Sequence, residues 1–230
     1  MKVFLCGGGS GDEVKLATTK FGEMIDKSKP LLYIPLAMKK ERYQSCLEWI
    51  TKEMGLINVT NIEMVTSSSE LAKKDLNNYC ALYIGGGNTY KLLSDLKSND
   101  SFENIKKYIM EGGIVFGGSA GAIIFGKDID SCKTQDSNDV NLKDTKGFNI
   151  LADYSLLCHL NRNDGVKFDR EKNSNYLLNF SLKNKIIYLP DDDTILVTED
   201  TISMIGNSSY RIYKDGKFKN IDVTNENLNL

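Results

Sequence analysis

Short apolar runs alternate with longer amphipathic segments along most of this chain. Several of the runs are apolar at every position, which is typical of strands covered on both faces. We expect strands at Val3–Cys6, Leu31–Leu36, Ala81–Ile84, Ile114–Phe116 and Ile186–Leu189, a weaker one at Asn58–Val65, and helices near 12–27, 40–54, 89–97, 102–111 and 167–182. The alternation predicts an α/β fold with an open, mostly parallel sheet and helices on both faces.

The last part of the chain has a different pattern. Short β-rich runs follow one another at Thr194–Glu199, Ile202–Ile205, Tyr210–Tyr213 and Phe218–Val223. The last two are joined through Asp215-Gly216, and an Asp-Gly pair between such runs is a strong hairpin signal. We therefore expect a C-terminal antiparallel hairpin extension of the same domain. A length of 230 residues suits one such domain spanning 1–230.

Charge and cysteine content exclude several classes of protein. The formal net charge of −2 gives no overall attraction to nucleic acid or to an anionic membrane. The five cysteines are odd in number and form no CxxC pair, which argues against a disulfide framework and a structural zinc site. The sequence has neither a signal-peptide pattern nor an apolar stretch long enough to span a membrane. We expect a cytoplasmic protein with no nucleic-acid or membrane partner.

A glycine-rich turn carries the clearest chemical signal. Gly117-Gly118-Ser119-Ala120-Gly121 follows a predicted strand and precedes an apolar helix, so it matches G-x-S-x-G in its required context. A nucleophile on a sharp strand-to-helix turn needs small neighbours, and all of these are Gly or Ala. Ser119 is therefore a candidate nucleophile, and the amide of Ala120 a candidate oxyanion donor. The alternative is a turn required only for close strand–helix packing.

A serine nucleophile needs a base, and the chain contains one histidine. His159 follows the apolar run Ser155–Leu157, so we expect it at the end of a strand. The acid that orients it is predicted to be Asp191, just past the strand at Ile186–Leu189. We interpret the neighbouring Asp192 and Asp193 as acidic residues of a turn. The sequence offers no second histidine or carboxylate cluster that would complete a metal site with them. The order Ser, His, acid differs from that of α/β-hydrolases, Ser, acid, His.

Two further glycine runs follow predicted strands. Gly85-Gly86-Gly87-Asn88 could supply a second oxyanion donor, or could be a turn with Asn88 or Thr89 as the helix N-cap. The run from Gly7 to Gly11 lacks the spacing of a phosphate loop. We interpret it as a structural turn or a wall of the site.

Together these residues resemble peptidase family S51, the dipeptidase E and cyanophycinase group. The resemblance rests on Tyr83–Thr89, Phe116–Ala122, His159 and Leu189-Pro190-Asp191. It implies a flavodoxin-like sheet related to class I glutamine amidotransferases, with Ser where those enzymes use Cys. It also implies hydrolysis of short peptides, notably those beginning with Asp, without metal or cofactor. Ser119 would be the nucleophile, His159 the base, and Gly86 or Gly87 with Ala120 the oxyanion donors.

The chain departs from the family pattern at three points. Cys158 stands where the family often has Pro, and Asp191-Asp192 where it commonly has Glu-Gly. Aspartate is one methylene shorter than glutamate, so an alternative acid lies in the loop after the nucleophile, at Asp136 or Asp139. The cation that an aspartyl pocket needs is open among three candidates: Lys127, Lys133 and Arg162.

Three readings of the function remain in competition. The first is a dipeptidase E-like serine peptidase acting through an acyl-enzyme. The second is a cyanophycinase-like isopeptide hydrolase. The third is a catalytically drifted member of the fold that binds a small amide or carboxylate through the elbow and the glycine loop with Gly86, Gly87 and Asn88. A glutamine amidotransferase subunit would need Cys at the elbow in place of Ser119. The sequence does not distinguish a monomer from a homodimer.

Overall fold

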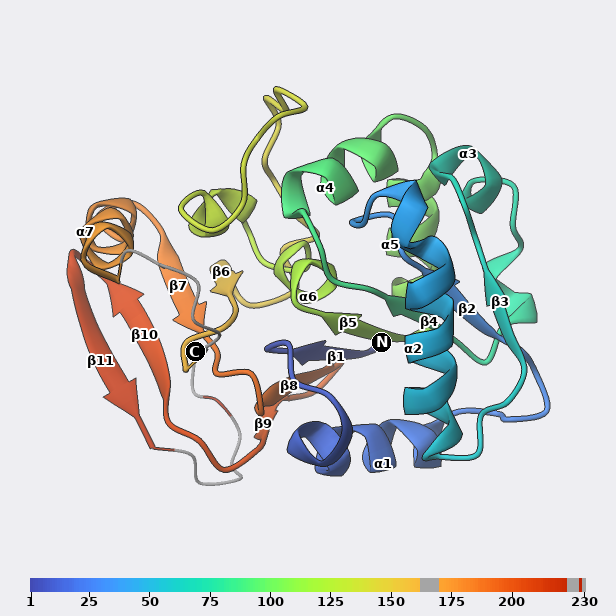
Figure 1. The fold of residues 1–230 in the computed structure, drawn as a ribbon. Coiled ribbons are helices and arrows are strands. Elements are labelled where there is room, and N and C mark those ends of the chain that lie inside the picture. The colour runs from blue at the N-terminus through green and yellow to red at the C-terminus, as the bar shows by residue number, and fades with distance from the viewer. Residues whose placement is uncertain (162–169, 223–227, 229–230) are drawn as a thin grey trace.

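A seven-stranded sheet forms the centre of the computed structural model, which describes residues 1–161, 170–222 and 228 (Figure 1). The strand order is β3-β2-β4-β5-β1-β8-β9. The strands are β1 (Lys2–Cys6), β2 (Leu31–Ile34), β3 (Ile62–Met64), β4 (Ala81–Ile84), β5 (Ile114–Gly118), β8 (Thr194–Thr198) and β9 (Ile202–Ile205). The first five in this order run parallel, and β8 and β9 are antiparallel to their neighbours. The predicted mostly parallel sheet is confirmed.

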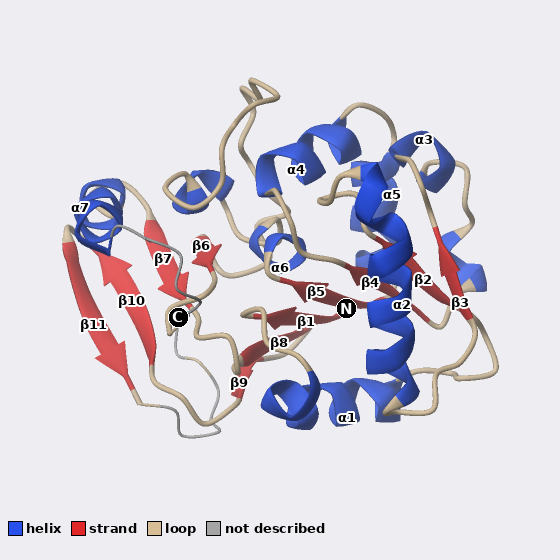
Figure 2. Ribbon diagram, viewed as in Figure 1, coloured by secondary structure: helices blue, strands red, loops and turns tan. Residues whose placement is uncertain are grey.

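Helices cover both faces of this sheet (Figure 2). Alternate side chains of β1 enter different cores, because successive residues of a strand point to opposite faces: Val3 and Leu5 enter one, Phe4 and Cys6 the other. The first core includes helices α4 (Thr89–Lys97), α5 (Ser101–Met110) and α6 (Ala120–Ile123). The second includes α1 (Lys15–Met24) and α2 (Tyr43–Gly55). This double burial explains why the central strands are apolar throughout.

A second sheet of four strands has the order β11-β10-β7-β6. Its strands are β6 (Tyr154–Leu157), β7 (Lys185–Tyr188), β10 (Tyr210–Lys214) and β11 (Lys217–Ile221), and α7 (Arg170–Phe180) lies beside it (Figure 1). Strands β6 and β7 are parallel, whereas β7, β10 and β11 pair antiparallel. Side chains of β6, β7 and β10 enter the same core as α4 and α6, so the two sheets share one apolar interior.

Several sequence predictions need correction at this level. The strand predicted at Ile186–Leu189 is present as β7, but it belongs to the second sheet and not to the central one. The C-terminal extension is antiparallel as expected, yet it divides: β8–β9 joins the central sheet and β10–β11 the second. The hairpin at Asp215-Gly216 is confirmed, with φ of 53° and 69°. The strand expected at Asn58–Val65 shortens to β3.

Helix boundaries agree closely with expectation, apart from short segments. The helix predicted at 89–97 coincides with α4, and those near 12–27 and 40–54 begin with 3₁₀ turns at Gly11–Val14 and Lys40–Arg42. The first residues of the helix predicted at 167–182 lie outside the described residues. The apolar pattern does not predict the one-turn helix α3 (Ser68–Leu71) or the 3₁₀ turns Leu76–Asn78 and Ile129–Cys132. Segments this short are too brief to show a helical period.

Candidate active site

Ser119 lies at the tip of a strained turn between β5 and α6. Its backbone has φ 52° and ψ −115°, a conformation that residues with a side chain rarely adopt. A Cβ at Gly117 would lie 2.3 Å from the Gly121 carbonyl oxygen, and one at Gly121 would lie 2.0 Å from the Ile84 oxygen. Both positions therefore require glycine, because the turn packs directly against its neighbours. The Ser119 amide donates to the Cys6 carbonyl at 3.1 Å, which ties the turn to β1.

His159 and Asp191 are brought to this turn by the second sheet. They follow β6 and β7, two parallel neighbours in which Leu157 is paired with Tyr188. His159 Nδ1 lies 2.5 Å from Asp191 Oδ1, and His159 Nε2 lies 2.8 Å from Ser119 Oγ. A carboxylate only accepts hydrogen bonds, so Nδ1 carries the proton and Nε2 is free to accept from the serine hydroxyl. The shorter aspartate side chain reaches the imidazole.

The first glycine run forms the wall behind this pair. A Cβ at Gly8 would lie 2.3 Å from His159 Cε1 and 3.0 Å from Asp191 Oδ1. The amide of Gly9 donates to the Asp191 carbonyl at 2.7 Å, and that of Gly7 to the Asp193 carbonyl at 2.9 Å. The Gly7–Gly9 segment is thus both a structural turn and a wall beside His159 and Asp191. The available signal was its position at the carboxyl end of β1, next to β5.

The Gly85–Asn88 loop also lies against Ser119. A Cβ at Gly86 would be 3.1 Å from Ser119 Cβ and 3.6 Å from Ser119 Oγ. The amides of Gly85 and Asn88 donate to the carbonyls of Ile34 and Ala37. Within the described part of the chain, the amides of Gly86 and Gly87 have no such acceptor. Ala120 opens α6, where N–H groups lack intrahelical partners. Gly86 thus lies beside Ser119, and a role of these amides as oxyanion donors stays a prediction.

Asn88, a candidate for substrate binding, and Asp136, the alternative acid, both form hydrogen bonds at the start of α4. Asn88 is the N-cap of α4: its Oδ1 accepts from the Lys91 amide at 2.8 Å, and its Nδ2 donates to the Ser137 carbonyl at 2.8 Å. A role of Asn88 in substrate binding stays a prediction. Asp136 Oδ2 accepts from the Thr89 amide at 2.7 Å, at the start of the same helix. The imidazole is thus paired with Asp191 and not with the alternative acid Asp136.

Buried thiols surround the serine without competing with it. Cys158 Sγ donates to the carbonyls of Ser119 and Cys6, both at 3.8 Å. Burial raises the pKa of the Cys6 thiol to about 11, and it raises the pKa of Cys158 well above its ordinary value. Because the thiolate is the reactive form, both groups are inert at neutral pH. The hydroxyl in contact with the imidazole of His159 is that of Ser119.

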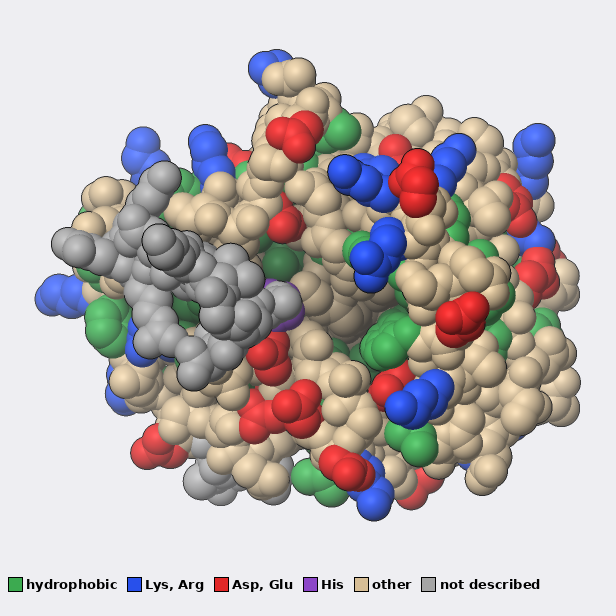
Figure 3. All heavy atoms as spheres, viewed as in Figure 1, with side chains coloured by type: hydrophobic (Ala, Val, Ile, Leu, Met, Phe, Trp, Pro, Cys, Tyr) green, Lys and Arg blue, Asp and Glu red, His purple; other side chains and the backbone are tan. Residues whose placement is uncertain are grey.

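The cations considered for an aspartyl pocket are only partly described. Lys127 Nζ forms an ion pair with Asp153 at 3.4 Å, and Lys133 is exposed. Arg162 lies outside the described residues. Figure 3 shows the histidine side chain at the margin of a hollow in this face of the molecule, with acidic side chains beside it.

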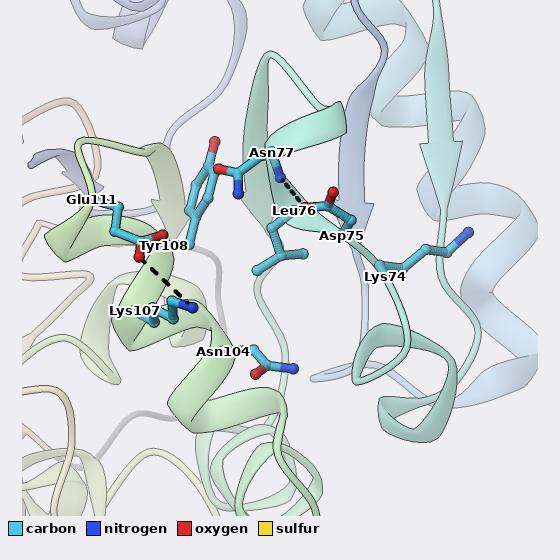
Figure 4. Close-up of a pocket in the computed structure, with 8 residues that line it drawn as sticks. All are labelled: Lys74, Asp75, Leu76, Asn77, Asn104, Lys107, Tyr108 and Glu111. Carbon is cyan, nitrogen blue, oxygen red and sulfur yellow. Dashed lines mark hydrogen bonds and ion pairs between the residues drawn. The ribbon is translucent and has the colours of Figure 1, made fainter.

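Other parts of the described chain offer no comparable chemistry. Residues 1–161, 170–222 and 228 contain no group of three His, Cys, Asp or Glu side chains arranged to hold a metal ion. A pocket at the opposite, amino ends of β4 and β5 has polar walls (Figure 4). It is lined by Lys74, Asp75, Leu76, Asn77, Asn104, Lys107, Tyr108 and Glu111. No helix among the described residues combines the length and apolarity that crossing a membrane requires.

Comparison with known proteins identifies the family. The model of peptidase family S51 matches residues 3–205. A peptidase E from Nostoc sp. is 27% identical over 209 residues, covering 87% of this chain and 82% of its own length. The crystal structure of a protein described as a peptidase E from Listeria monocytogenes superposes with a TM-score of 0.72 and 25% identity, covering 90% of this chain and 98% of its own.

A second crystal structure supports the fold alone. A peptidase from an acI-B1 Actinobacterium superposes with a TM-score of 0.74 at 17% identity, and the match covers 99% of this chain and 96% of that one. The family match spans the elbow, the histidine, the acid and the three glycine runs. The chain belongs to peptidase family S51 and is a serine-type peptidase.

Proposed function

We propose that this chain hydrolyses short peptides through an acyl-enzyme, with Ser119 as nucleophile, His159 as base and Asp191 as the orienting acid. The observation that carries the proposal is the continuous contact from Ser119 Oγ through the imidazole to Asp191 Oδ1, at 2.8 and 2.5 Å. A nucleophile within hydrogen-bond reach of a base, itself oriented by a third group, is the geometry of activated serine hydrolysis.

The proposed reaction has two stages. Ser119 Oγ attacks the peptide carbonyl carbon while His159 Nε2 takes the hydroxyl proton, and the imidazolium then gives this proton to the leaving amine. A water molecule next attacks the ester carbonyl, with His159 again accepting the proton, and the acid product leaves as Ser119 is restored. Asp191 stabilises the imidazolium in both stages without itself being protonated.

The negative oxygen of each tetrahedral intermediate needs fixed donors. The amides of Ala120 and of Gly86 or Gly87 are proposed for this role, since Ala120 follows Ser119 directly, Gly86 lies against it and Gly87 is the next residue of the same loop. Loss of one such donor costs about 10²–10³ in rate in a serine peptidase. The loss expected for one donor is therefore about ten- to a hundredfold smaller than the roughly 10⁴-fold loss expected for an orienting acid.

The names of the relatives support a peptide substrate. The Nostoc and Listeria proteins are both described as peptidase E. An N-terminal aspartate is the first preference to test, and a β-aspartyl isopeptide is the substrate that the cyanophycinase-like alternative requires.

A substrate panel tests this proposal. Asp-Leu, Asp-Ala, Leu-Leu, Lys-Leu and β-Asp-Arg are incubated separately with the protein and with Ser119→Ala, and free amino acids are quantified. We expect turnover of at least one α-linked dipeptide by the wild type, its loss in the variant, and no change on adding a chelator. Absence of turnover across the panel would favour the small-ligand-binding alternative, and cleavage of β-Asp-Arg alone would favour the isopeptide hydrolase.

A further inference from the structure

Three consecutive aspartates follow β7, and each has different partners. Asp191 Oδ1 contacts the imidazole of His159. Asp192 Oδ1 accepts from Asn161 Nδ2 at 3.1 Å, and its Oδ2 accepts from the Ser208 hydroxyl. Asp193 Oδ1 accepts from the backbone amides of Asn207 and Ser208 at 3.1 and 3.2 Å. One of the acids therefore faces the site, and the other two hold the loop on which it stands.

Asn161 joins this acid loop to the segment that carries the histidine. It stands two residues after His159, and its Oδ1 accepts from the Asp191 backbone amide at 2.8 Å. Its Nδ2 donates to Asp192 Oδ1 at 3.1 Å, so one amide side chain uses both of its ends on two successive residues. The side chain is exposed and fills no space in either core. Its contacts are therefore directed at the acid loop and not at packing.

Because the side chain of Asp191 is short, the hydrogen bond from its main chain to Asn161 also determines where its carboxylate lies. An aspartate carboxylate is separated from its main chain by two rotatable bonds, so its position follows the main chain closely. The bond from Asn161 Oδ1 is made to the main-chain nitrogen of Asp191 itself. His159, at the other end, has φ 72°, a strained value that persists only where surrounding contacts fix it. Holding both segments with one side chain sets the distance between imidazole and carboxylate.

We propose that Asn161 is a positioning residue that, with Asp192, holds Asp191 against His159. This inference rests on the proposed function of the Ser119–His159–Asp191 contact. Asn161 acts through Asp191 and does not itself touch the reacting atoms. Its loss lowers kcat and leaves KM unchanged, because the acid acts in proton transfer and not in holding the substrate.

An exchange of the two side chains tests the role directly. Asn161→Asp keeps the acceptor for the Asp191 amide, loses the donor to Asp192 and places two carboxylates together. In the double variant Asn161→Asp/Asp192→Asn, the amide group of residue 192 donates to residue 161 and its oxygen accepts from Ser208. The exchange thus restores every hydrogen bond of the wild type and keeps its net charge. Asp192→Asn alone completes the cycle, and Asn104→Asp, in the remote pocket of Figure 4, is the matched control.

The expected result is a loss followed by a rescue. Asn161→Asp lowers kcat about tenfold on the best dipeptide, the size typical of a contacting pair, while the double variant returns to within about threefold of the wild type. Labelling of Ser119 by a small fluorophosphonate slows and recovers in parallel. Asn104→Asp leaves both rates unchanged. Thermal unfolding midpoints are recorded for all variants, since a merely structural tie lowers the midpoint without a matching change in kcat.

Two outcomes would overturn the inference. The first is an Asn161→Asp variant with wild-type kcat, and the second is a double variant no faster than the single one although folded. Either result leaves the proposed function standing as long as Ser119→Ala is inactive. An active Ser119→Ala variant would instead refute the proposed function itself.

Discussion

The two halves of the site are built in different ways. On the nucleophile side, Ser119 and the residues that force its conformation lie within five consecutive positions, Gly117–Gly121. On the base–acid side, His159 and Asp191 are 32 residues apart and meet because β6 and β7 are neighbours in the second sheet. Their support comes from further segments, the Gly7–Gly9 run and Asn161.

This difference shows what fixes the positions of the side chains in each half of the site. The proposed nucleophile is positioned by steric exclusion, since only glycine fits at positions 117 and 121, and these positions lie within a short stretch of sequence. The base and acid are positioned by hydrogen bonds between loops, a constraint that exists only once both sheets have formed. We expect a substitution on the Ser119 side to affect that turn alone. A substitution on the His159–Asp191 side should also displace the loops that its hydrogen bonds connect.

The largest effect is expected at the nucleophile. Ser119→Gly removes the hydroxyl and also relieves the strain at φ 52°, so activity falls by about 10⁶-fold while the free energy of unfolding rises by about 1 kcal/mol. Steady-state kinetics and urea unfolding measure the two changes. A variant that is inactive and also less stable than the wild type would mean that the turn stores no strain.

The next largest effect separates the two candidate acids. Asp191→Asn leaves the imidazole with a partner of the wrong hydrogen-bonding character and lowers kcat by about 10⁴-fold, as for other orienting aspartates. Asp136→Asn, whose oxygen serves the Thr89 amide, keeps activity near that of the wild type. Comparison of kcat for the two variants decides the assignment. The reverse order of effects would place the acid in the loop after the nucleophile.

An added methyl group tests the wall behind the base. Gly8→Ala places a Cβ against the imidazole and the Asp191 carboxylate, and a displacement of this kind lowers kcat by about 10²-fold. Gly11→Ala is the matched control: its φ is also positive, at 58°, but a Cβ there meets no atom within 4 Å. The control therefore loses stability and keeps kcat. Equal losses of kcat in both variants would show that the wall has no specific role.

The smallest effect concerns stability and pH. Burial raises the pKa of the Asp193 carboxyl from 3.8 to about 6, so the folded chain binds this proton more tightly than the unfolded chain. The stability contributed by this group is present at low pH and is lost as the pH rises through 6. Asp193→Asn keeps an oxygen for the Asn207 and Ser208 amides but does not ionise. The free energy of unfolding is measured in urea at pH 5 and pH 8. From the lower to the higher pH, it should fall by about 1 kcal/mol more in the wild type than in the variant. A difference independent of pH would contradict this account.

The same contrast explains what the sequence could predict. The central sheet and the elbow at Ser119 follow from local signals, apolar periods and small residues in a fixed order. The assignment of Ile186–Leu189 to the central sheet was wrong because a buried parallel strand has the same pattern in either sheet. The position of Asp191 after a strand predicts that it lies at the edge of a sheet. Its pairing with His159 depends on the register between β6 and β7, which no local pattern encodes. The contacts of Asn161 and Gly8 also join segments that are far apart in the chain, so no local pattern predicts them.

Covalent labelling tests the central proposal, the activation of Ser119 by His159 and Asp191, most directly. The protein is treated with a small fluorophosphonate, the adduct is mapped by mass spectrometry, and the rate is compared with that of Asp191→Asn and Ser119→Ala. We predict one adduct, at Ser119, formed markedly more slowly in Asp191→Asn and absent in Ser119→Ala. Labelling at another residue, or at Ser119 with the same rate in Asp191→Asn, would contradict the account.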